Sequence, residues 1–386
     1  MRRSGKTNIL YGLFKSAKQA AFYLDFEDER LIDFKTEDFE RLRESILELH
    51  PELIGKPYSL LLDEVQIIPG WEKFCRRLVE RENVEVIVSG SSSKVIPENI
   101  HTELRGRSWG IEVFPFSFAE YLQLKNVDFQ DPRIFHGDLS IQLKQRLTEY
   151  LQWGGFPEVL LLEDPAAKQK LLQEYMQAMF FKDIVEKYQI TNIALLGRLL
   201  DKLFTSYSTK MSLLAFYKQY KQSLPFSKDL LYAYYKHLLD SMLIQEIHIN
   251  TESSYKKNRN PAKHYLVDIG LARRSTANDW GRRLENIVFM ELCRRQYAVS
   301  YFFETKECDF IATAPDGTVL PLQVTWELNA SNREREVEGL TAACQRFDCP
   351  EGLLLTQDHP SETTLKNTNI KIMPAWEWLL QTADPR

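Results

Sequence analysis

Short apolar runs alternate with amphipathic stretches along the first 125 residues of the chain. Residues 60–62 and 84–88 have the composition of buried strands, and the segments around them have helical spacing. A region that alternates strand and helix in this way is typical of a parallel sheet covered by helices. We therefore predict a doubly wound α/β domain over residues 1–125.

The pattern changes after that domain. Helical periodicity dominates residues 126–188 and breaks at residues 153–155, where two glycines fit either a hinge or a loop forced by packing. Residues 189–274 contain amphipathic helices and then a β-ribbon around the basic loop 256–260, which is the order of a winged helix. Residues 275–386 are expected to form helix, strand, strand, helix and strand, which predicts a small α/β domain.

The composition is that of an ordinary globular protein. Hydrophobic residues make up 44% and charged residues 27% of the 386 positions. This length predicts two or three domains. No apolar stretch approaches the roughly 18 residues of a membrane span, so we expect no membrane insertion. The five cysteines form no C-x-x-C pair and favour neither disulfides nor zinc, so a cytoplasmic location fits best.

Charge is distributed unevenly along the chain. The net charge of −5 argues against a nonspecific nucleic-acid coat. Residues 182–263 nevertheless contain 13 Lys and Arg against 7 Asp and Glu. Candidate contacts to nucleic-acid phosphates in this region are Lys228, Lys236, Lys256, Lys257 and Arg259. Solvated lysines on a protein-docking or packing module explain the same residues, and both alternatives stay open.

The first chemical motif lies at the N-terminus. Arg3, Ser4, Gly5, Lys6 and Thr7 form the second half of a nucleotide-binding G-x-x-x-x-G-K-[ST] loop. In such a loop Gly5 turns backbone amides toward phosphate, Lys6 reaches the β- and γ-phosphates, and Thr7 binds Mg²⁺. The first glycine of the loop and the strand ahead of it would precede the first residue. We therefore expect the true start to lie upstream, and nucleotide binding by this polypeptide to be weakened.

A second motif favours the nucleotide site over a basic N-terminus that merely leads into a helix. The apolar run at residues 60–62 ends in the adjacent carboxylates Asp63 and Glu64. At the carboxyl end of a buried parallel strand, Asp63 would hold Mg²⁺, usually through water, and Glu64 would act as general base on the attacking water. Adjacent acids also commonly close a strand and cap the next helix. Their combination with an upstream G-K-T favours catalysis.

Two further segments carry candidate polar groups. The run at residues 84–88 leads into a serine-rich turn, where Ser89 or Ser91 is a candidate sensor of the γ-phosphate or else a helix cap. Arg105 and Arg107 flank a glycine just ahead of a short strand expected at residues 111–113. Either arginine is a candidate finger for its own or a neighbouring subunit. Pairing with surface acids is the equal alternative.

These motifs occur in an order that resembles a known family. The segments R-R-S-G-K-T, L-L-L-D-E-V-Q, S-G-S-S-S, L-R-G-R, F-P-F-S-F-A-E-Y, W-G-G-F-P-E and Y-L-V-D-I-G-L are together similar to the prokaryotic AAA+ ATPases often called archaeal-type ATPases. The resemblance covers nearly the whole chain. It implies a P-loop ATPase domain that uses ATP and Mg²⁺, a helical lid, a winged helix and a nuclease-like C-terminal domain.

The C-terminal region resembles the PD-(D/E)xK nuclease fold, with departures. Glu285 on a helix and Asp309 on a strand match metal-binding acids of that fold. Gln323 stands in place of the next acid and Thr325 in place of the lysine. Glutamine brings no negative charge to a hard dication, and threonine supplies no ammonium. We therefore expect this domain to be catalytically silent.

Three functional hypotheses follow. The leading one is a cytoplasmic Mg²⁺-dependent ATPase that couples its nucleotide state to a DNA- or protein-binding C-terminal half. A finger acting in trans would require a homo-oligomer, which the sequence leaves open. The alternative is a DNA-binding regulator with little or no ATP hydrolysis. A nuclease is the least favoured hypothesis.

Overall fold

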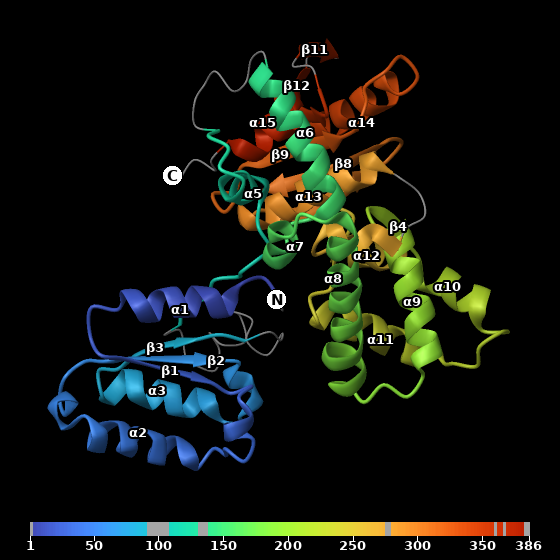
Figure 1. Ribbon diagram of the computed structural model, residues 1–386. Coiled ribbons are helices and arrows are strands. Elements are labelled where there is room, and N and C mark those ends of the chain that lie inside the picture. Colours follow the sequence, from blue (N-terminus) through green and yellow to red (C-terminus); the bar gives the residue numbers. More distant parts are fainter. Residues whose placement is uncertain are drawn as a thin grey trace. The chain divides into compact units, whose positions relative to one another are not determined.

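The computed structural model describes residues 3–90, 108–129, 138–274, 279–358, 361–365 and 368–381. The chain forms two compact units: the first comprises Met1–Phe114 and Asp240–Met242, and the second comprises Pro115–Leu239 and Leu243–Arg386. Figure 1 labels the helices and strands of both units. The finer division into four regions remains a prediction.

The first unit is a parallel sheet between helices, as its sequence pattern predicted. Its described elements are, in chain order, α1 (Lys6–Ser16), β1 (Ala21–Asp25), α2 (Asp38–Leu49), β2 (Ser59–Asp63), α3 (Trp71–Arg81) and β3 (Glu85–Val88). The strands pair in the order β1-β2-β3, all parallel. Helix α1 covers one face of this sheet, and α2 and α3 cover the other (Figure 1). All three strands therefore end at the same edge of the sheet.

The core of the first unit lies between the sheet and the α2–α3 layer. Strand β2 is central and buried along its whole length, which explains its apolar run. Leu60 and Leu62 pack in one cluster with Phe39 of α2 and with Phe74 of α3, and the rings of these phenylalanines stack with centroids 4.5 Å apart. This packing fixes the position at which β2 ends, with Asp63 as its last residue.

The strand expected at residues 111–113 is absent. Residues 108–114 have no regular secondary structure. Trp109 is 91% and Ile111 74% exposed, so this segment buries little of the apolar surface that would hold it against a sheet. The apolar pattern there was too short to determine its conformation.

The second unit begins with helices. Its first part contains α5 (Phe118–Leu124), α6 (Asp138–Trp153), α7 (Pro157–Leu161), α8 (Pro165–Ala178), a π-helical continuation (Met179–Glu186) and α9 (Ile193–Thr205). There follow β4 (Thr209–Met211), α10 (Leu213–Tyr220), α11 (Lys228–Asp240), β5 (Ile244–Ile247), α12 (Ser254–Arg259) and β6 (Ala262–Leu266). Strands β4, β6 and β5 form an antiparallel sheet in that order.

The basic loop expected at residues 256–260 is largely helical. Helix α12 spans most of it, and the Ser253 hydroxyl accepts a hydrogen bond from the Lys256 amide at its start. A serine N-cap satisfies an amide that would otherwise lack a partner, which favours a helical turn. The sequence prediction missed this cap.

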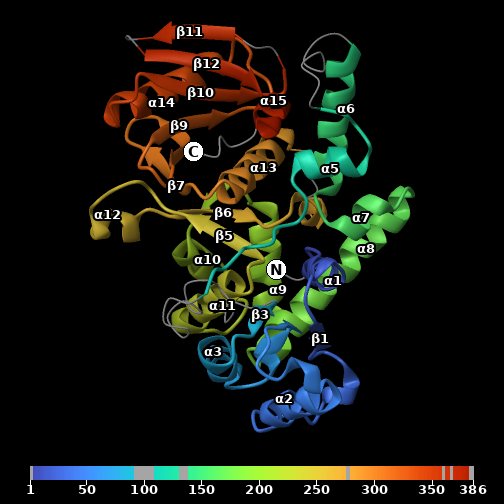
Figure 2. The same ribbon diagram turned by 90° about the vertical axis from the view of Figure 1, so that its left-hand side faces the viewer.

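The C-terminal part of the second unit is built on a mixed sheet. Its described elements are α13 (Trp280–Arg294), β7 (Ala298–Phe303), β8 (Glu307–Thr313), β9 (Val319–Val324), α14 (Arg333–Arg346), β10 (Glu351–Thr356), β11 (Ser361–Leu365), β12 (Thr368–Pro374) and α15 (Ala375–Leu380). The strand order is β11-β12-β10-β9-β8-β7. Figure 2 labels β11, β12, β10, β9 and β7 of this sheet. The sequence pattern predicted three strands in this region. Strands β7 and β11, and one of β10 and β12, were therefore not predicted.

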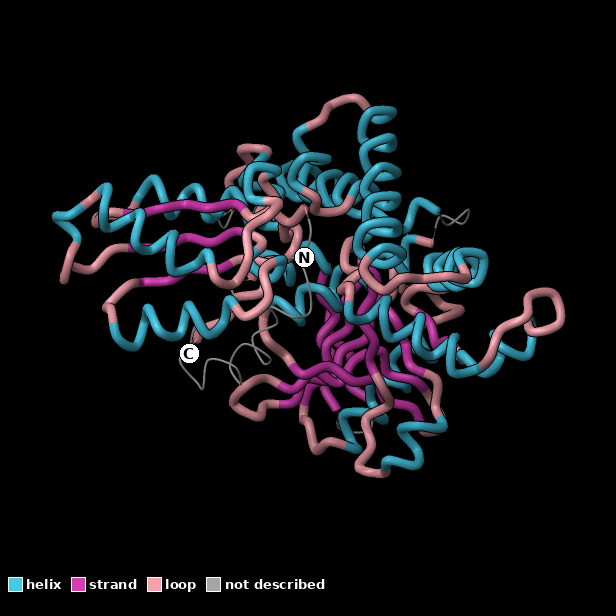
Figure 3. Tube along the Cα trace, turned by 90° about the horizontal axis from the view of Figure 1, so that it is seen from below, coloured by secondary structure: helices cyan, strands magenta, loops and turns pink. Residues whose placement is uncertain are grey.

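Figure 3 distinguishes the helices and strands of the described residues by colour. No helix among the described residues is both long enough and apolar enough to cross a bilayer.

Candidate nucleotide site and carboxylate cluster

Helix α1 begins immediately after a sharp turn of the backbone. Arg3 has a φ of 64° and Gly5 a φ of 92°, and Ser4 between them is buried. Glycine tolerates this left-handed conformation, which a side chain would strain. The turn leads into Lys6 and Thr7, the first residues of the helix. The first amides of α1 therefore lie beside the candidate phosphate-binding residues.

The start of α1 meets the end of β2 through a side-chain hydrogen bond. Thr7 Oγ1 donates to Asp63 Oδ2 at 2.7 Å, although 56 residues separate the two in sequence. A hydroxyl and a carboxylate oxygen are hard donors of the kind that Mg²⁺ prefers. The residues present therefore fit an Mg²⁺ ion held between α1 and β2.

Asp63 is held by several further donors. Its side chain is almost fully buried, Tyr23 Oη donates to Oδ2 at 3.0 Å, and the Glu64 amide donates to Oδ1 at 3.1 Å. The Ser89 hydroxyl also donates to Oδ1. These contacts fix the orientation of the carboxylate from β1 and from the residues that directly follow β2 and β3. Ser89, a candidate from the sequence, thus lies next to Asp63.

Sequence reasoning missed Tyr23. This residue lies on β1, two positions before the strand ends. Burial and the neighbouring Asp63 carboxylate raise the pKa of Tyr23 well above its usual value, so the phenol keeps its proton and donates. Nothing local distinguishes it from any other tyrosine on a strand, and only the β1–β2 pairing brings it to Asp63.

Glu64 adopts an unusual backbone conformation beside Lys6. Its φ is 50°, a region that non-glycine residues rarely occupy and that is often found at functional sites. Lys6 Nζ lies 4.0 Å from Glu64 Oε1, and Gln66 Nε2 donates to Glu64 Oε2 at 2.5 Å. The side chains of Lys6 and Glu64 are each 12% exposed. The carboxylate is therefore held next to the lysine at the edge of the sheet.

The structure thus brings together Lys6, Thr7, Asp63, Glu64 and Ser89. Ser91, Arg105 and Arg107 lie outside the described residues, so their roles remain predictions.

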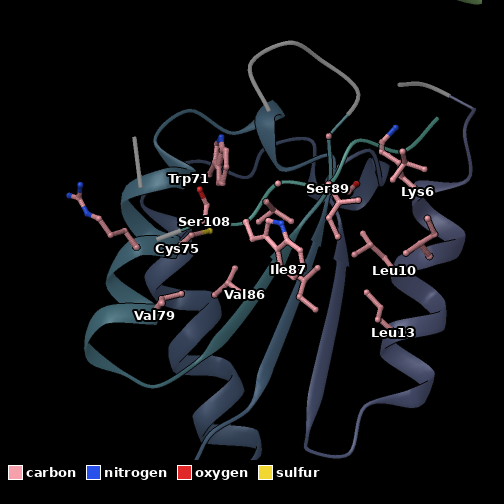
Figure 4. Close-up of a pocket in the computed structure, with 18 residues that line it drawn as sticks. Lys6, Leu10, Leu13, Trp71, Cys75, Val79, Val86, Ile87, Ser89 and Ser108 are labelled. Carbon is pink, nitrogen blue, oxygen red and sulfur yellow. The ribbon is translucent and has the colours of Figure 1, made fainter. Parts of the chain in front are cut away.

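An apolar pocket of about 390 Å³ adjoins this group in the first unit. Figure 4 shows Leu10 and Leu13 of α1 on one side, Trp71 of α3 on the other, and Lys6 and Ser89 at one end. Hydrocarbon walls offer a phosphate no donors. Arg76 and Ser108 also line the pocket, so its polar groups are not confined to the Lys6 end.

A second group of charged residues lies in the second unit. Glu285 of α13 and Asp309 of β8 approach each other around the buried ammonium of Lys263 on β6. Lys263 Nζ lies 3.2 Å from Glu285 Oε1 and 2.9 Å from Asp309 Oδ1. The structure therefore brings together the two acids that the sequence paired, and adds a lysine that sequence reasoning missed.

Gln323 completes this second group as a hydrogen-bond link. Its Oε1 accepts from the Asp309 amide at 3.0 Å, and its Nε2 donates to Glu336 Oε2 at 2.6 Å. No group of three or more His, Cys, Asp or Glu among the described residues is arranged to hold a metal ion.

Electrostatics at this group favour the charged form of the lysine. Burial disfavours the Lys263 ammonium, but the surrounding carboxylates outweigh it and hold the Lys263 pKa well above its usual value. Burial raises the pKa of Glu285 to about 8, with Lys263 opposing that rise. The Tyr265 hydroxyl adds a donor to Glu285 Oε1 at 2.8 Å.

The glycines at residues 154 and 155 pack against a buried carboxylate. The Gly155 and Gly270 amides donate to the two oxygens of Asp268 at 2.7 and 2.8 Å. A Cβ on Gly154 would collide with Asp268, and one on Gly155 would collide with the Phe116 carbonyl. Close backbone approach therefore accounts for both glycines, and a hinge role stays a prediction.

The lysines proposed for nucleic-acid contact lie on the surface of the second unit. Lys228 and Lys236 of α11 and Lys256 and Lys257 of α12 are all exposed. The ammonium of Lys228 lies 5.5 Å from the centroid of the Tyr217 ring, within cation–π range. The side chain of Arg259 lies outside the described residues.

Comparison with known proteins agrees with the geometry of the first unit. Residues 1–122 match the model of a family described as an AAA domain. Residues 144–281 match a family described as a domain of unknown function (DUF8612). The first unit has a parallel sheet with G-K-T and Asp-Glu at one edge, and it matches an AAA model. The first unit is therefore an AAA-type P-loop domain.

Two relatives match nearly the whole chain. The uncharacterized protein MJ1544 of Methanocaldococcus jannaschii is 30% identical over 394 residues, covering 98% of this chain and 87% of the relative. An uncharacterized protein of Haemophilus influenzae is 28% identical over 396 residues, covering 99% of this chain and 93% of that protein. The chain therefore belongs to the family of AAA-domain proteins that includes MJ1544.

Proposed function

We propose that this chain binds ATP with Mg²⁺ at the carboxyl edge of the β1-β2-β3 sheet and hydrolyses it. The observation that carries the proposal is the 2.7 Å contact between Thr7 and Asp63, the two residues expected to share the metal. The 4.0 Å approach of Lys6 to Glu64 supports it. Four residues from two distant motifs thereby gather at one end of one sheet.

Each of these residues has a distinct role in the proposed reaction. The turn at Gly5 and the first amides of α1 bind phosphate oxygens, and Lys6 neutralises charge on the β- and γ-phosphates. Thr7 and Asp63 hold Mg²⁺, which neutralises the phosphate charge that develops during transfer.

Glu64 is the general base. It accepts a proton from the attacking water as that oxygen bonds to the γ-phosphorus and the bond to the β-γ bridging oxygen breaks. Ser89, which donates to Asp63, is the proposed sensor of the γ-phosphate.

The test compares Mg²⁺-dependent ATP hydrolysis by the full chain with that of Glu64→Gln. We expect the variant to bind ATP and to hydrolyse it about 10²-fold or more slowly, because only the base is lost. Glu48→Gln, at an exposed position of α2, is the matched control and should behave as the wild type. Equal hydrolysis by Glu64→Gln and the wild type would remove Glu64 from the mechanism, and no hydrolysis above background by either would refute the ATPase.

Contact with DNA by the second unit is a second candidate function. The observation that favours it is the order α9, β4, α10, α11, β5, α12 and β6 with an antiparallel β4-β6-β5 sheet, which is the order of a winged helix. Helix α11 would then be the recognition helix, and it presents Lys228 and Lys236 to solvent.

Salt dependence tests this second function. Duplex DNA binding should weaken as salt rises, and the double variant Lys256→Glu and Lys257→Glu should weaken it at every salt concentration and flatten that dependence. Lys170→Glu, an exposed position on α8, is the control. Binding that is indifferent to salt, or equally sensitive to the control substitution, would contradict a specific interface on α11 and α12.

A further inference from the structure

A lysine lies at the centre of the carboxylate cluster in the second unit. Lys263 Nζ is within ion-pair distance of Glu285 at 3.2 Å, Glu307 at 2.8 Å and Asp309 at 2.9 Å. Its side chain is only 4% exposed. The three oxygens come from one helix and one strand, whereas the ammonium comes from β6 of the other sheet. Backbone hydrogen bonds of Tyr301 on β7 with His248 and Asn250, just after β5, already join the two sheets at one point. The Lys263 ammonium adds a side-chain link between β6 and β8.

A second lysine extends this arrangement. Lys210 of β4 is the direct partner of Lys263 in the β4–β6 register, and two facing lysines repel unless both are neutralised. Glu307 pairs with both, because Oε1 lies 2.8 Å from Lys263 Nζ and Oε2 lies 2.8 Å from Lys210 Nζ. The two lysines face three carboxylates, so the charges nearly balance.

The oxygens of Glu285, Glu307 and Asp309 are spaced for an ammonium, at 2.8–3.2 Å from Lys263 Nζ, and would have to move closer together to hold a metal. Oxygens of three acids converge on the single nitrogen atom of Lys263, and a divalent cation bound by the same oxygens would lie within about 2.0–2.6 Å of each. The ammonium and the metal exclude each other from that point by size and by like charge. Gln323 stands where the nuclease fold has an acid. A carboxylate at that position would add a negative charge that Lys263 alone would leave uncompensated, and glutamine is uncharged.

We propose that the Lys263 ammonium is the resident cation of the Glu285–Glu307–Asp309 cluster, which it keeps free of divalent metal while it ties the β4-β6-β5 sheet to the C-terminal sheet. This inference is independent of the proposed ATPase. It gives a physical reason for a nuclease-like set of acids without the nuclease lysine: the cation is supplied from β6 and is a permanent part of the chain.

Binding of Mn²⁺ to the full chain without ATP tests the proposal. The wild type, Lys263→Met, Asp309→Asn and the Lys263→Met/Asp309→Asn double variant are freed of metal with EDTA and titrated, and bound Mn²⁺ is counted by electron paramagnetic resonance. Methionine has nearly the length of lysine but no charge. Lys306→Met, an exposed lysine paired with Glu338, is the matched control.

We expect Lys263→Met to bind one more Mn²⁺ per chain than the wild type, and the double variant to lose that gain. The thermal unfolding temperature of Lys263→Met should fall in EDTA and recover with Mn²⁺, whereas that of Lys306→Met should not respond. A folded Lys263→Met that binds no additional Mn²⁺ would overturn the proposal.

Two measurements keep the proposal testable should Lys263→Met fail to fold with or without Mn²⁺. Asp309→Asn in the otherwise wild-type chain should leave the number of bound Mn²⁺ ions unchanged, because the cluster holds none. A loss of one Mn²⁺ in that variant would show that the wild-type cluster binds metal and would overturn the proposal. Metal-dependent cleavage of DNA by the wild type, abolished by Asp309→Ala, would do the same.

Discussion

The buried carboxylate of Asp268 should make the stability of the second unit depend on pH. Burial raises its pKa from 3.8 to about 7, although the Gly155 and Gly270 amides and the nearby Arg294 oppose the rise. The perturbation is Asp268→Asn, which keeps an oxygen that can accept a hydrogen bond and carries no charge. The amide nitrogen of the new side chain meets a backbone donor, so the variant loses one of the two hydrogen bonds.

The sign of the effect follows from the direction of the pKa change. Between pH 4 and 7 the folded state of the wild type binds a proton at Asp268 that the unfolded state has lost, so the free energy of unfolding falls as pH rises. A rise from 3.8 to about 7 corresponds, at about 1.4 kcal/mol for each pKa unit, to roughly 4 kcal/mol. Above pH 7 Asp268 is ionised in both the folded and the unfolded state, so it no longer makes the free energy of unfolding change with pH.

Urea denaturation across pH 4 to 8 measures this difference, and hydrogen exchange of peptides around Gly155 assigns the transition to the second unit. The wild type should lose several kcal/mol relative to Asp268→Asn between pH 4 and 7. Asp201→Asn, at an exposed position of α9, should run parallel to the wild type. Parallel pH profiles of the wild type and Asp268→Asn would refute the reasoning, because they would mean that Asp268 has the same pKa in both states.

Three other substitutions test separate parts of the chain. Gly155→Ala should lower the free energy of unfolding, measured by urea denaturation, by about 2 kcal/mol or more, because its methyl group would meet a backbone carbonyl. Gly197→Ala is the control and should not lower it, because the new methyl group would meet no atom within 4 Å. Thr7→Val should weaken Mg²⁺-dependent ATP binding about tenfold or more by calorimetry, and Thr7→Ser should retain it; equal affinities would remove this hydroxyl from the metal site. Gln323→Glu should destabilise the second unit by roughly 2 kcal/mol in thermal melts, because it sets a carboxylate against Glu336, and an unchanged melting temperature would contradict this.

Sequence patterns predicted the α/β character of the first unit because its strands are local and apolar. The strand ending at Asp63 was recognisable from three leucines followed by acids, and β3 from a β-branched run. Residues 111–113 carried a similar but shorter pattern and form no strand, since little of their apolar surface is buried. Edge strand β7 depends on its pairing with β8, which no local pattern encodes.

The sequence by itself determined which chemistry the first unit offers: a lysine and a threonine after a glycine, and two carboxylates after a buried strand. It also indicated Glu285 and Asp309, because both occur in recognisable local motifs. The tertiary structure alone decided that Thr7 meets Asp63, that Tyr23 holds the same carboxylate, and that Lys263 fills the acidic cluster. A motif consists of neighbouring residues and can be recognised in the sequence, whereas contacts between distant residues depend on how strands pair and helices pack.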